Sequence, residues 1–526
     1  MYRIIVSDPL EKTGLAMLRE SGHEVIEVAA EDKDQLPELL ADADALVVRS
    51  GTKVTADLLR AGKQLKVVGR AGIGVDNVDI ETATSLGILV VNAPTANLIS
   101  ATEHTFALLL AVARNVAAAD GDIKGGAWNR KKFVGAELQG KKLGIIGFGR
   151  IGQAVARRGR AFDMEILAYD PFLDADVVRR ESAAPRSLEA LLAEADVVTL
   201  HIPLTDDTRN LLSAERLAGI KEGAILINCA RGGVVDEDAL LEGLESGRIA
   251  AAGIDVFAQE PPTDYTLAQH PRVVATPHLG AQTREAQVRI STQTAKMVVS
   301  ALEGSLAVSA VNLPFRPAGG GGAPFLRLGE KLGLLAGGLA EGSLQRVEVR
   351  SIGVDSSLLE PITIAALRGS MVRSLGAAAV NYVNAARLAE KRGVEVVQST
   401  ARSGGDFPTQ VTLVVTTDEG TLTVAGTLVH DREPRIVRLD DYRFELVPKQ
   451  DVLVVRNRDV PGVVGKLGTL LGDAGVNIAE IHLSRLAGGN ALAAIRIDQD
   501  LEAALLSEVR GLDEVVTADV VDLGPL

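Results

Sequence analysis

The chain has 526 residues, of which 47% are hydrophobic, 24% are charged and 53 are glycine. This composition is typical of globular domains and excludes a largely disordered chain, and the length predicts three or four domains of about 100–200 residues each. Lys and Arg total 55 against 69 Asp and Glu, a formal charge of −14, so the excess positive charge that nonspecific nucleic-acid binding requires is missing.

The cysteine content limits the chemistry of the chain. Cys229 is the only cysteine, which excludes an intrachain disulfide and any multi-cysteine metal site and fits a reducing compartment. No run of 18 apolar residues is present, and residues 1–8 have the pattern of a short buried strand. We therefore expect a cytoplasmic protein with no metal, no membrane partner and no nucleic-acid partner.

The first 97 residues alternate short β-branched runs with helical patterns, which predicts a parallel sheet with crossover helices. A helix is expected over 98–116. Its residues 106–113 are apolar at every position, so we expect it to be buried on all sides, between domains or between subunits. The expected strands lie at 4–6, 25–28, 45–48, 66–68 and 89–91.

A second series of strands and helices begins at Lys141 and predicts a longer parallel sheet. Its later strands are expected at 196–200, 224–228, 251–256 and 273–276. A helical stretch over 284–303 follows. Residues 313–322 contain two prolines and end in four consecutive glycines, which is typical of a linker.

The composition changes after this linker. Residues 320–448 predict a third domain, with helices over 361–375 and 380–391 and a β-hairpin formed by 409–417 and 422–429. The last segment has the order strand, helix, strand, strand, helix, strand of a ferredoxin-like module. Its elements are expected at 452–456, 462–474, 477–483, 491–497, 501–509 and 515–521. Such modules suit ligand sensing.

A glycine-rich turn identifies the candidate cofactor site. Gly147, Gly149 and Gly152 form the pattern G-x-G-x-x-G directly after an expected strand and at the start of a helix. The glycines permit a tight turn and a close approach to a pyrophosphate, which the helix N-terminus stabilises. The next strand ends in Asp170, at the separation where a carboxylate meets the ribose hydroxyls. Because Asp170 would repel a 2′-phosphate, NAD is favoured over NADP.

Three later strands each end in a residue that suits the oxidation of a 2-hydroxy acid. His278 is the candidate base, because a hydride transfer from an alcohol also releases a proton. Glu260 is expected to fix the imidazole tautomer, and Arg231 to bind the substrate carboxylate and polarise the reacting oxygen. Singly, each residue has a structural explanation, as a satisfied histidine, a turn residue or a helix cap. Their joint placement favours catalysis.

These residues and the segments around them resemble the D-isomer-specific 2-hydroxyacid dehydrogenase family, and within it the D-3-phosphoglycerate dehydrogenases. The matching segments are 48–50, 68–77, 144–152, 229–237 and 277–281. The resemblance implies an α/β fold with a Rossmann-type parallel-sheet cofactor domain inserted in a flavodoxin-like substrate domain, followed by two α+β regulatory domains. The implied boundaries are 1–97 with 285–316 for substrate, 98–284 for NAD, 317–448 for an intervening allosteric substrate-binding-like domain, and 449–526 for an ACT regulatory domain.

The family resemblance also implies an activity and its ligands. The implied reaction is the NAD-dependent oxidation of 3-phospho-D-glycerate to 3-phosphohydroxypyruvate, which opens serine synthesis, in a homo-oligomer whose usual state in the family is a tetramer. L-serine is the implied effector, at Asp459 and Asn477. Further cofactor contacts are implied at Arg150, Ile151, Cys229, Ala230, Asp255, Gly280 and Ala281. Substrate contacts are implied at Arg49, Lys53, Arg70, Ala71, Gly72 and Asn97, with Arg130 and Lys131 reaching into a neighbouring subunit's site.

Two other functions fit parts of the same pattern. A dehydrogenase or reductase for another D-2-hydroxy acid, such as a glyoxylate reductase, would keep the catalytic residues without needing the phosphate-binding cations. An NAD-sensing binding protein, like the corepressors that share this fold, would bind NAD and turn over slowly. For Lys53, Arg130 and Lys131, a solvated surface position explains the charge equally well.

Overall fold

The computed structural model describes residues 1–305, 309–315 and 322–525. These residues form two compact units. One comprises Met1–Gln64, Val68–Val78 and Val91–Glu303, and the other comprises Leu65–Val67, Asp79–Val90 and Gly304–Leu526. The linker expected at 313–322 lies for the most part outside the described residues.

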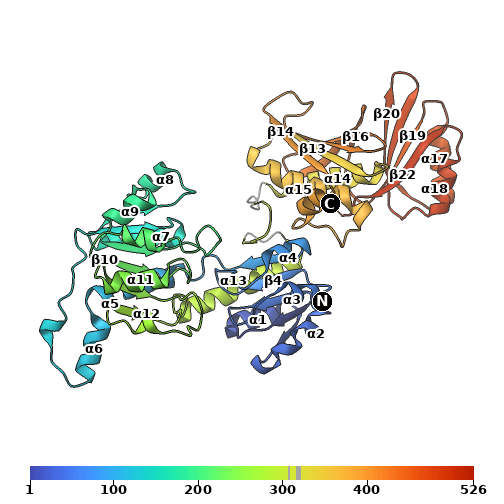
Figure 1. Cartoon of the computed structure of the whole chain (residues 1–526). Coiled ribbons are helices and arrows are strands. Elements are labelled where there is room, and N and C mark those ends of the chain that lie inside the picture. Colours follow the sequence, from blue (N-terminus) through green and yellow to red (C-terminus); the bar gives the residue numbers. More distant parts are fainter. Residues whose placement is uncertain (306–308, 316–321, 526) are drawn as a thin grey trace. The chain divides into compact units, whose positions relative to one another are not determined.

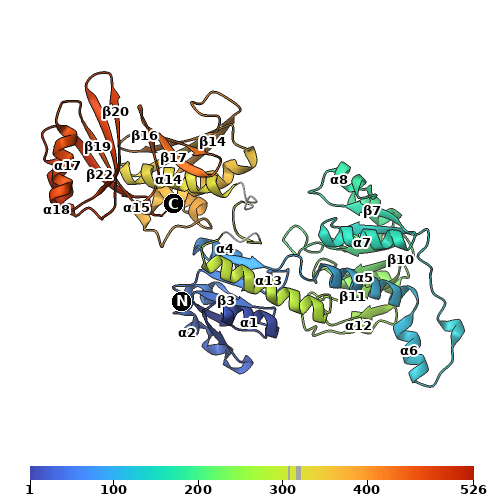
Figure 2. The same ribbon diagram turned by 180° about the vertical axis from the view of Figure 1, so that it is seen from behind.

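The N-terminal strands form the predicted parallel sheet (Figure 1). Its order is β2-β1-β3-β4-β5, the order of flavodoxin-like sheets. Helix α13 (Arg284–Leu302) returns to this sheet late in the chain and packs against α1 (Lys12–Glu20) (Figure 2). The strands are β1 (Arg3–Val6), β2 (Glu24–Glu27), β3 (Ala45–Val48), β4 (Val67–Arg70) and β5 (Leu89–Asn92). The other helices are η1 (Ala30–Gln35), α2 (Leu36–Leu40), α3 (Ala56–Ala61) and α4 (Ile80–Ser85).

The second sheet has seven strands in the order β12-β11-β10-β9-β6-β7-β8. The strand order reverses between β6 and β9, and in open sheets of this kind ligands bind beyond the strand ends at such a reversal. All five residues of β10 are buried, as expected of a strand covered by helices on both faces. The strands are β6 (Lys142–Ile146), β7 (Glu165–Tyr169), β8 (Ala184–Pro185), β9 (Val197–Leu200), β10 (Ala224–Asn228), β11 (Ile249–Ile254) and β12 (Val273–Ala275).

The helices of this sheet follow its strands in the alternation that the sequence predicts. Helix α5 packs against β10, β11 and β12 on one side of the sheet and also contacts α7. The helices are α5 (Leu98–Ala113), α6 (Val116–Lys124), η2 (Arg130–Lys132), α7 (Arg150–Ala161), α8 (Ala175–Arg180), α9 (Leu188–Glu194), α10 (Ala214–Ala218), α11 (Glu237–Glu245) and α12 (Thr266–Gln269).

The helix predicted over 98–116 differs from the one observed. Helix α5 ends at Ala113, and Asn115 adopts a left-handed conformation with φ 52° that separates it from α6. Only one side of α5 is buried, because Ile99 is 44% exposed and Leu110 is 36% exposed. The prediction that this helix is buried on every side is therefore wrong within a single chain. The run of apolar residues does not distinguish a core face from a face that is left open.

The C-terminal unit contains a six-stranded sheet in the order β14-β13-β15-β16-β17-β18. The predicted hairpin is confirmed as the antiparallel pair of β15 and β16. Helix α16 begins at Ala385, five residues later than expected. The elements are α14 (Ala323–Leu339), β13 (Leu344–Ile352), η3 (Ser356–Leu358), α15 (Leu359–Leu375), α16 (Ala385–Lys391), β14 (Glu395–Ala401), β15 (Gln410–Thr417), β16 (Thr421–Val429), β17 (Glu433–Leu439) and β18 (Tyr442–Leu446).

The last segment has the predicted strand and helix order and forms a four-stranded antiparallel sheet, β20-β21-β19-β22. Helices α17 and α18 cover one face of this sheet, and α14 packs on the other side, against β22 (Figure 1). The elements are β19 (Asp451–Arg458), α17 (Val463–Asp473), β20 (Ile478–Leu486), β21 (Asn490–Ile497), α18 (Ala503–Arg510) and β22 (Val515–Asp522).

Among the described helices, none combines the length and the apolar character that crossing a membrane requires.

Candidate active site

The glycine-rich turn joins β6 to α7 at the switch point of the seven-stranded sheet. Gly147 has φ 89°, a left-handed conformation that favours glycine, and Gly152 lies so close to the turn that an added Cβ would be 2.2 Å from the Gly147 carbonyl oxygen. Nothing lies within 4 Å of the equivalent position at Gly149, so this part of the backbone is open to a ligand. Arg150 and Ile151 begin α7, whose N-terminus has no side-chain cap. Free N–H groups at such a helix end suit a pyrophosphate.

Asp170 lies beside this turn, directly after β7. Its Oδ2 accepts a hydrogen bond from the Phe148 amide at 2.9 Å, and its Oδ1 accepts one from the Phe172 amide at 3.0 Å. The two bonds hold the carboxylate next to the glycine turn, where an adenosine ribose is bound in sheets of this order. The turn and Asp170 therefore fit a dinucleotide.

Strands β10, β11 and β12 are neighbours and run parallel, so their carboxyl ends lie at one edge of the sheet. The segment after β12 carries His278 and the loop after β11 carries Glu260, and the structure brings the two together. His278 Nδ1 donates to Glu260 Oε2 at 2.7 Å, and the Phe257 amide donates to Glu260 Oε1 at 3.1 Å. With its proton on Nδ1, the neutral imidazole keeps Nε2 as the nitrogen that can accept a proton.

The environment of Glu260 keeps its carboxylate charged. Partial burial raises the pKa of Glu260, but the hydrogen bond and charge of His278 and the Phe257 amide lower it, and the net pKa is below its ordinary value. A charged carboxylate on Nδ1 stabilises an imidazolium once Nε2 has accepted a proton.

Asp255 holds the segment that carries His278. Its side chain is fully buried, and it accepts hydrogen bonds from the Leu279 amide at 2.7 Å and the Gly280 amide at 2.9 Å. Its own carbonyl oxygen accepts a bond from the His278 amide at 2.8 Å. Asp255 thus fixes the backbone through Gly280, directly before Ala281. Asp255, predicted as a cofactor contact, therefore also orders the segment that carries His278.

Arg231 follows β10 and points toward the five-stranded sheet. The Asn228 side chain donates to the Arg231 carbonyl at 3.0 Å and fixes the turn, in which the Ala230 amide donates to Asn228 Oδ1 at 3.0 Å. Arg231 Nε donates to Asp76 Oδ2 at 2.9 Å. Asp76 was not among the predicted site residues, although it lies six residues beyond the end of β4, where site residues gather.

A group of cations lies across from the catalytic pair. Burial and the charges of Arg231 and Arg49 lower the pKa of Arg70 to about 10, while Asp76 and Asp8 oppose this shift. Three guanidinium groups therefore lie near one another with two carboxylates among them. Such a cluster favours an anionic ligand. Arg49 directly follows β3 and Arg70 ends β4, so neighbouring strands of one sheet supply both.

The remaining substrate candidates have different surroundings. Ala71 and Gly72 continue from β4, and the Ala71 amide donates to the Val48 carbonyl at 2.7 Å. In the part of the chain that the structure describes, the buried Asn97 Oδ1 has no hydrogen-bond partner, which leaves an acceptor available to a ligand. Lys53 is exposed.

Arg130 and Lys131 lie outside the cation cluster of this chain. They are exposed residues of η2, in the loop that follows α6, and this arm projects from the body of its unit in both views (Figures 1 and 2).

Cys229 is next to the site but carries no nucleophile. Burial, followed by the nearby charge of Asp255, raises the pKa of its thiol to about 12. The thiolate that nucleophilic catalysis needs is therefore absent at neutral pH.

The two effector candidates are not brought together in one chain. The Asp459 amide donates to the Gly489 carbonyl at 2.8 Å, at the β20–β21 turn. The Asn477 side chain donates to Asp498 Oδ2 at 2.6 Å, at the other end of the same strand pair. Asp459 and Asn477 therefore lie at opposite ends of the four-stranded sheet.

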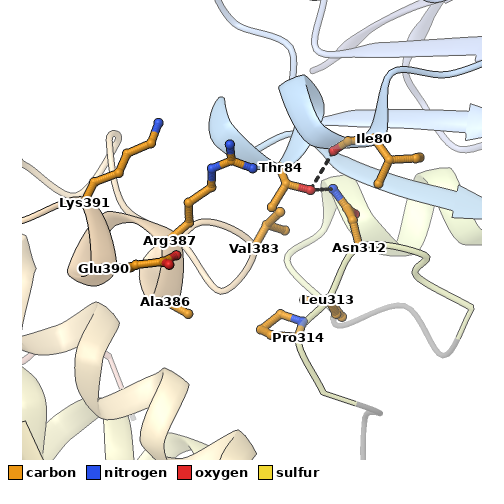
Figure 3. A pocket seen from close by; sticks show the side chains of 10 residues that line it. All are labelled: Ile80, Thr84, Asn312, Leu313, Pro314, Val383, Ala386, Arg387, Glu390 and Lys391. Atoms are coloured by element: carbon orange, nitrogen blue, oxygen red, sulfur yellow. Dashed lines mark hydrogen bonds between the residues drawn. The ribbon is translucent and has the colours of Figure 1, made fainter. Parts of the chain in front are cut away.

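A pocket of about 700 Å³ in the C-terminal unit contains none of the predicted site residues (Figure 3). On one wall the Thr84 hydroxyl donates to the Ile80 carbonyl at 2.7 Å and accepts from the Asn312 side chain at 3.1 Å. Arg387 and Lys391 bring positive charge to the opposite wall, but Arg387 is already paired with Glu81 at 2.6 Å. Neither His278 nor Glu260 lines this pocket.

Two family models match the chain. The NAD binding domain of the D-isomer specific 2-hydroxyacid dehydrogenases matches residues 106–280, and the intervening domain of D-3-phosphoglycerate dehydrogenase matches residues 323–440. The first match, together with Asp170 beside the glycine turn, identifies the cofactor as NAD.

Curated relatives match over nearly the whole chain. The D-3-phosphoglycerate dehydrogenase of Bacillus subtilis strain 168 is 38% identical over 526 residues, which cover 99% of this chain and 100% of the relative. That of Mycobacterium bovis is 41% identical over 530 residues, covering 99% of each. A crystal structure of D-lactate dehydrogenase from Aquifex aeolicus, complexed with NAD and lactic acid, is 29% identical with a TM-score of 0.53, and covers 59% of this chain and 98% of that one. The chain belongs to the D-3-phosphoglycerate dehydrogenases, within the D-isomer specific 2-hydroxyacid dehydrogenases.

Proposed function

We propose that the chain catalyses the NAD-dependent oxidation of 3-phospho-D-glycerate to 3-phosphohydroxypyruvate, the first step of L-serine biosynthesis. The observation that carries this proposal is the 2.7 Å bond between His278 Nδ1 and Glu260 Oε2. It fixes an imidazole base at the strand edge beyond the glycine turn, while the guanidinium cluster supplies charge for an anionic acid. The name shared by the full-length relatives supports the choice of substrate.

Each catalytic residue has a step that its surroundings suit. Arg231 binds the substrate carboxylate and polarises the oxygen on C2. His278 Nε2 accepts the proton of the C2 hydroxyl, and Glu260 stabilises the imidazolium that results. NAD held at the glycine turn and Asp170 would supply the acceptor for the hydride that leaves C2. The bond from C2 to hydrogen and the bond from oxygen to hydrogen break together, which leaves the 2-oxo acid.

The phosphate of the substrate is assigned to the cations of the five-stranded sheet. This chain itself supplies Arg49, Lys53 and Arg70. Arg49 directly follows β3, Lys53 lies in the loop after β3, and Arg70 ends β4. Arg130 and Lys131 are assigned to the site of a neighbouring subunit, which the projecting arm supports. A phosphate needs several such donors, because each surface cation alone contributes little.

An assay of NADH production tests the substrate. The full-length chain is given 3-phosphoglycerate, D-glycerate, D-lactate or glycolate, each with NAD. We expect a kcat/KM for 3-phosphoglycerate at least ~100-fold above that for D-glycerate, because charge-assisted phosphate contacts are lost with the unphosphorylated acid. His278→Ala should lose at least ~100-fold in kcat while NADH still binds, since the base acts on the proton and not on the cofactor. Equal rates with D-glycerate would favour a dehydrogenase for another 2-hydroxy acid.

We assign the last 78 residues, 449–526, to an ACT domain that binds L-serine. Asp459 and Asn477 lie at opposite ends of one sheet, so a serine contacting both needs two copies placed side by side and running in opposite directions. Strand β20 is an edge strand, which suits such a pairing. Serine added to the NADH assay tests this regulation.

The proposed assembly is a homotetramer in the cytoplasm. Exposed apolar side chains of α5 and of the segment after α6 support an interface, because Ile99 is 44%, Leu110 36% and Trp128 78% exposed. The lone cysteine supports a reducing compartment.

A further inference from the structure

A histidine outside the catalytic pair lies against the strand ends that carry it. His104 is on α5, on the side that packs against the sheet, and only 17% of its side chain is exposed. Its Nε2 is 3.1 Å from Asp255 Oδ1 and 3.0 Å from Thr276 Oγ1. The imidazole of His104 therefore contacts the residue that follows β11 and the residue that follows β12, at the edge of the sheet that carries the catalytic pair.

The hydrogen bonds around His104 fix its tautomer. The Thr276 hydroxyl donates to Asp255 Oδ1 at 2.6 Å, so its hydrogen is already used. An ionised carboxylate has only acceptors, and the Thr276 oxygen has only lone pairs left to offer. Both atoms that face Nε2 are therefore acceptors. His104 must carry its proton on Nε2 and donate it to this pair.

This N–H helps to keep Asp255 charged inside the protein. Burial raises the pKa of the Asp255 carboxyl, but hydrogen bonds from His104, Thr276 and the Leu279 amide lower it, and the net pKa is below its ordinary value. The other ionisable groups near this carboxylate are Cys229, whose thiol is neutral, and Glu260. Neither can replace the donor that His104 supplies.

The charge on Asp255 matters because the catalytic segment is bound to it. Asp255 accepts from the amides of Leu279 and Gly280, and its carbonyl oxygen accepts from the amide of His278. His278 has φ 54°, in the left-handed region that is uncommon for residues other than glycine. Such a conformation persists where surrounding bonds impose it.

We propose that His104 is a positioning residue of the dehydrogenase, acting through Asp255 to hold the His278 imidazole in the orientation that proton transfer requires. The proposal rests on the proposed function only in taking His278 as the base. His104 touches neither the substrate nor the reacting atoms in this role. Its effect belongs to the turnover step, because small misplacements of a catalytic group cost rate more than they cost binding.

Two variants distinguish the effect of the His104 N–H donor from the effect of its side-chain volume. His104→Gln keeps an amide N–H near the position of Nε2, and His104→Met removes the donor while filling similar space. His270→Met is the matched control, because His270 belongs to the same domain and lies at the end of α12, away from Asp255. All are made in the full-length chain, and kcat, KM and NADH affinity are measured between about pH 6 and pH 9.

We expect His104→Met to lose ~10-fold to ~100-fold in kcat with KM and NADH affinity within ~3-fold of wild type, and His104→Gln to recover most of the loss. His270→Met should match wild type. If His104→Met does not fold, His104→Asn, whose amide is too short to reach Asp255, takes its place.

The proposal is overturned if the variant lacking the donor keeps kcat within ~3-fold of wild type, or if the glutamine variant loses as much as the methionine variant, which would assign the effect to packing. The wild type is measured first with each 2-hydroxy acid. If the proposed function is wrong, the wild-type enzyme will not prefer 3-phosphoglycerate. The test of His104 does not depend on that preference, because it compares the kcat of each variant with that of wild type for whichever acid is oxidised.

Discussion

The guanidinium groups of Arg49, Arg70 and Arg231 repel one another in the protein without ligand. Burial and the neighbouring charges of Arg231 and Arg49 lower the pKa of Arg70 to about 10. The protonated guanidinium therefore costs stability at every pH below about 10, and the cost declines as the pH rises from about 10 toward the pKa of an exposed arginine. An anion bound between these guanidinium groups would offset this loss of stability. The cluster therefore favours binding of an anionic ligand.

Replacing Arg70 should separate stability from substrate binding. In Arg70→Met we expect an unchanged or higher melting temperature at pH 7, because one of three mutually repelling charges is gone. The KM for 3-phosphoglycerate should rise ~10-fold to ~100-fold, since charge-assisted phosphate bonds are lost. Thermal denaturation and NADH kinetics measure the two effects, and Arg19→Met, at an exposed ion pair on α1, is the control. A melting temperature lowered by many degrees would contradict the account of repulsion.

At the scale of elements, the turn between β6 and α7 uses its glycines for different purposes. An added Cβ at Gly152 would lie 2.2 Å from the Gly147 carbonyl oxygen, a backbone atom that cannot give way easily. At Gly149 the same atom would meet nothing within 4 Å, and its φ of −72° is open to any residue. Gly152 therefore serves the packing of α7 on β6, and Gly149 serves the approach of the cofactor.

This difference predicts opposite results for two alanine substitutions. Gly152→Ala should lower the melting temperature and weaken NADH binding together, because α7 must move away from β6. Gly149→Ala should leave the melting temperature within ~2 °C of wild type and still weaken NADH binding ~10-fold or more, because the methyl group occupies the pyrophosphate approach. Calorimetric titration and thermal melts report both quantities. Equal loss of stability in the two variants would refute the division of roles.

The elements that follow a local pattern were predictable from the sequence. Apart from β8, the strands of both parallel sheets and the whole C-terminal βαββαβ module occur where alternating and buried patterns place them, and the glycine turn has the expected context. The break in α5 was missed, because it depends on the left-handed conformation of Asn115. The pairing of Asp76 with Arg231, residues 155 positions apart, was missed because no local pattern encodes a contact between distant segments.

At the scale of the molecule, the C-terminal half is an addition to a smaller catalytic architecture. A complete D-lactate dehydrogenase chain corresponds to only 59% of this one. Asn312 is a buried side chain that hydrogen-bonds to the backbone of β5 and of the residue before it. Its Oδ1 accepts from the Val90 amide at 2.8 Å, and its Nδ2 donates to the Ile88 carbonyl at 2.9 Å. Phe315, three residues further along the chain, belongs to the core of the C-terminal half.

The position of Asn312 predicts where the chain can be shortened. A chain ending after Pro314 keeps these bonds and should fold, bind NADH and oxidise 3-phosphoglycerate. The contacts that it loses near α4, such as the ion pair of Arg387 with the exposed Glu81, involve polar groups that water can satisfy. A chain ending after Ser305 leaves the Val90 amide and the Ile88 carbonyl unpaired and should be destabilised by ~2–6 kcal/mol, at about 1–3 kcal/mol for each of the two buried groups.

Asn312→Leu in the full-length chain isolates the side chain from the truncation. It removes the hydrogen bonds of Asn312 with similar volume but keeps the bond from the Val311 amide to the Val90 carbonyl, so its loss of stability in urea denaturation should account for much of the loss in the shorter fragment. If the chain ending after Pro314 fails to fold while Asn312→Leu is as stable as wild type, the C-terminal half is required for the fold of the catalytic part. If both fragments fold equally well, Asn312 does not seal the edge of the sheet. Only a stable longer fragment beside a weakened shorter one agrees with the bonds described, because the two differ by Asn312 and eight neighbouring residues alone.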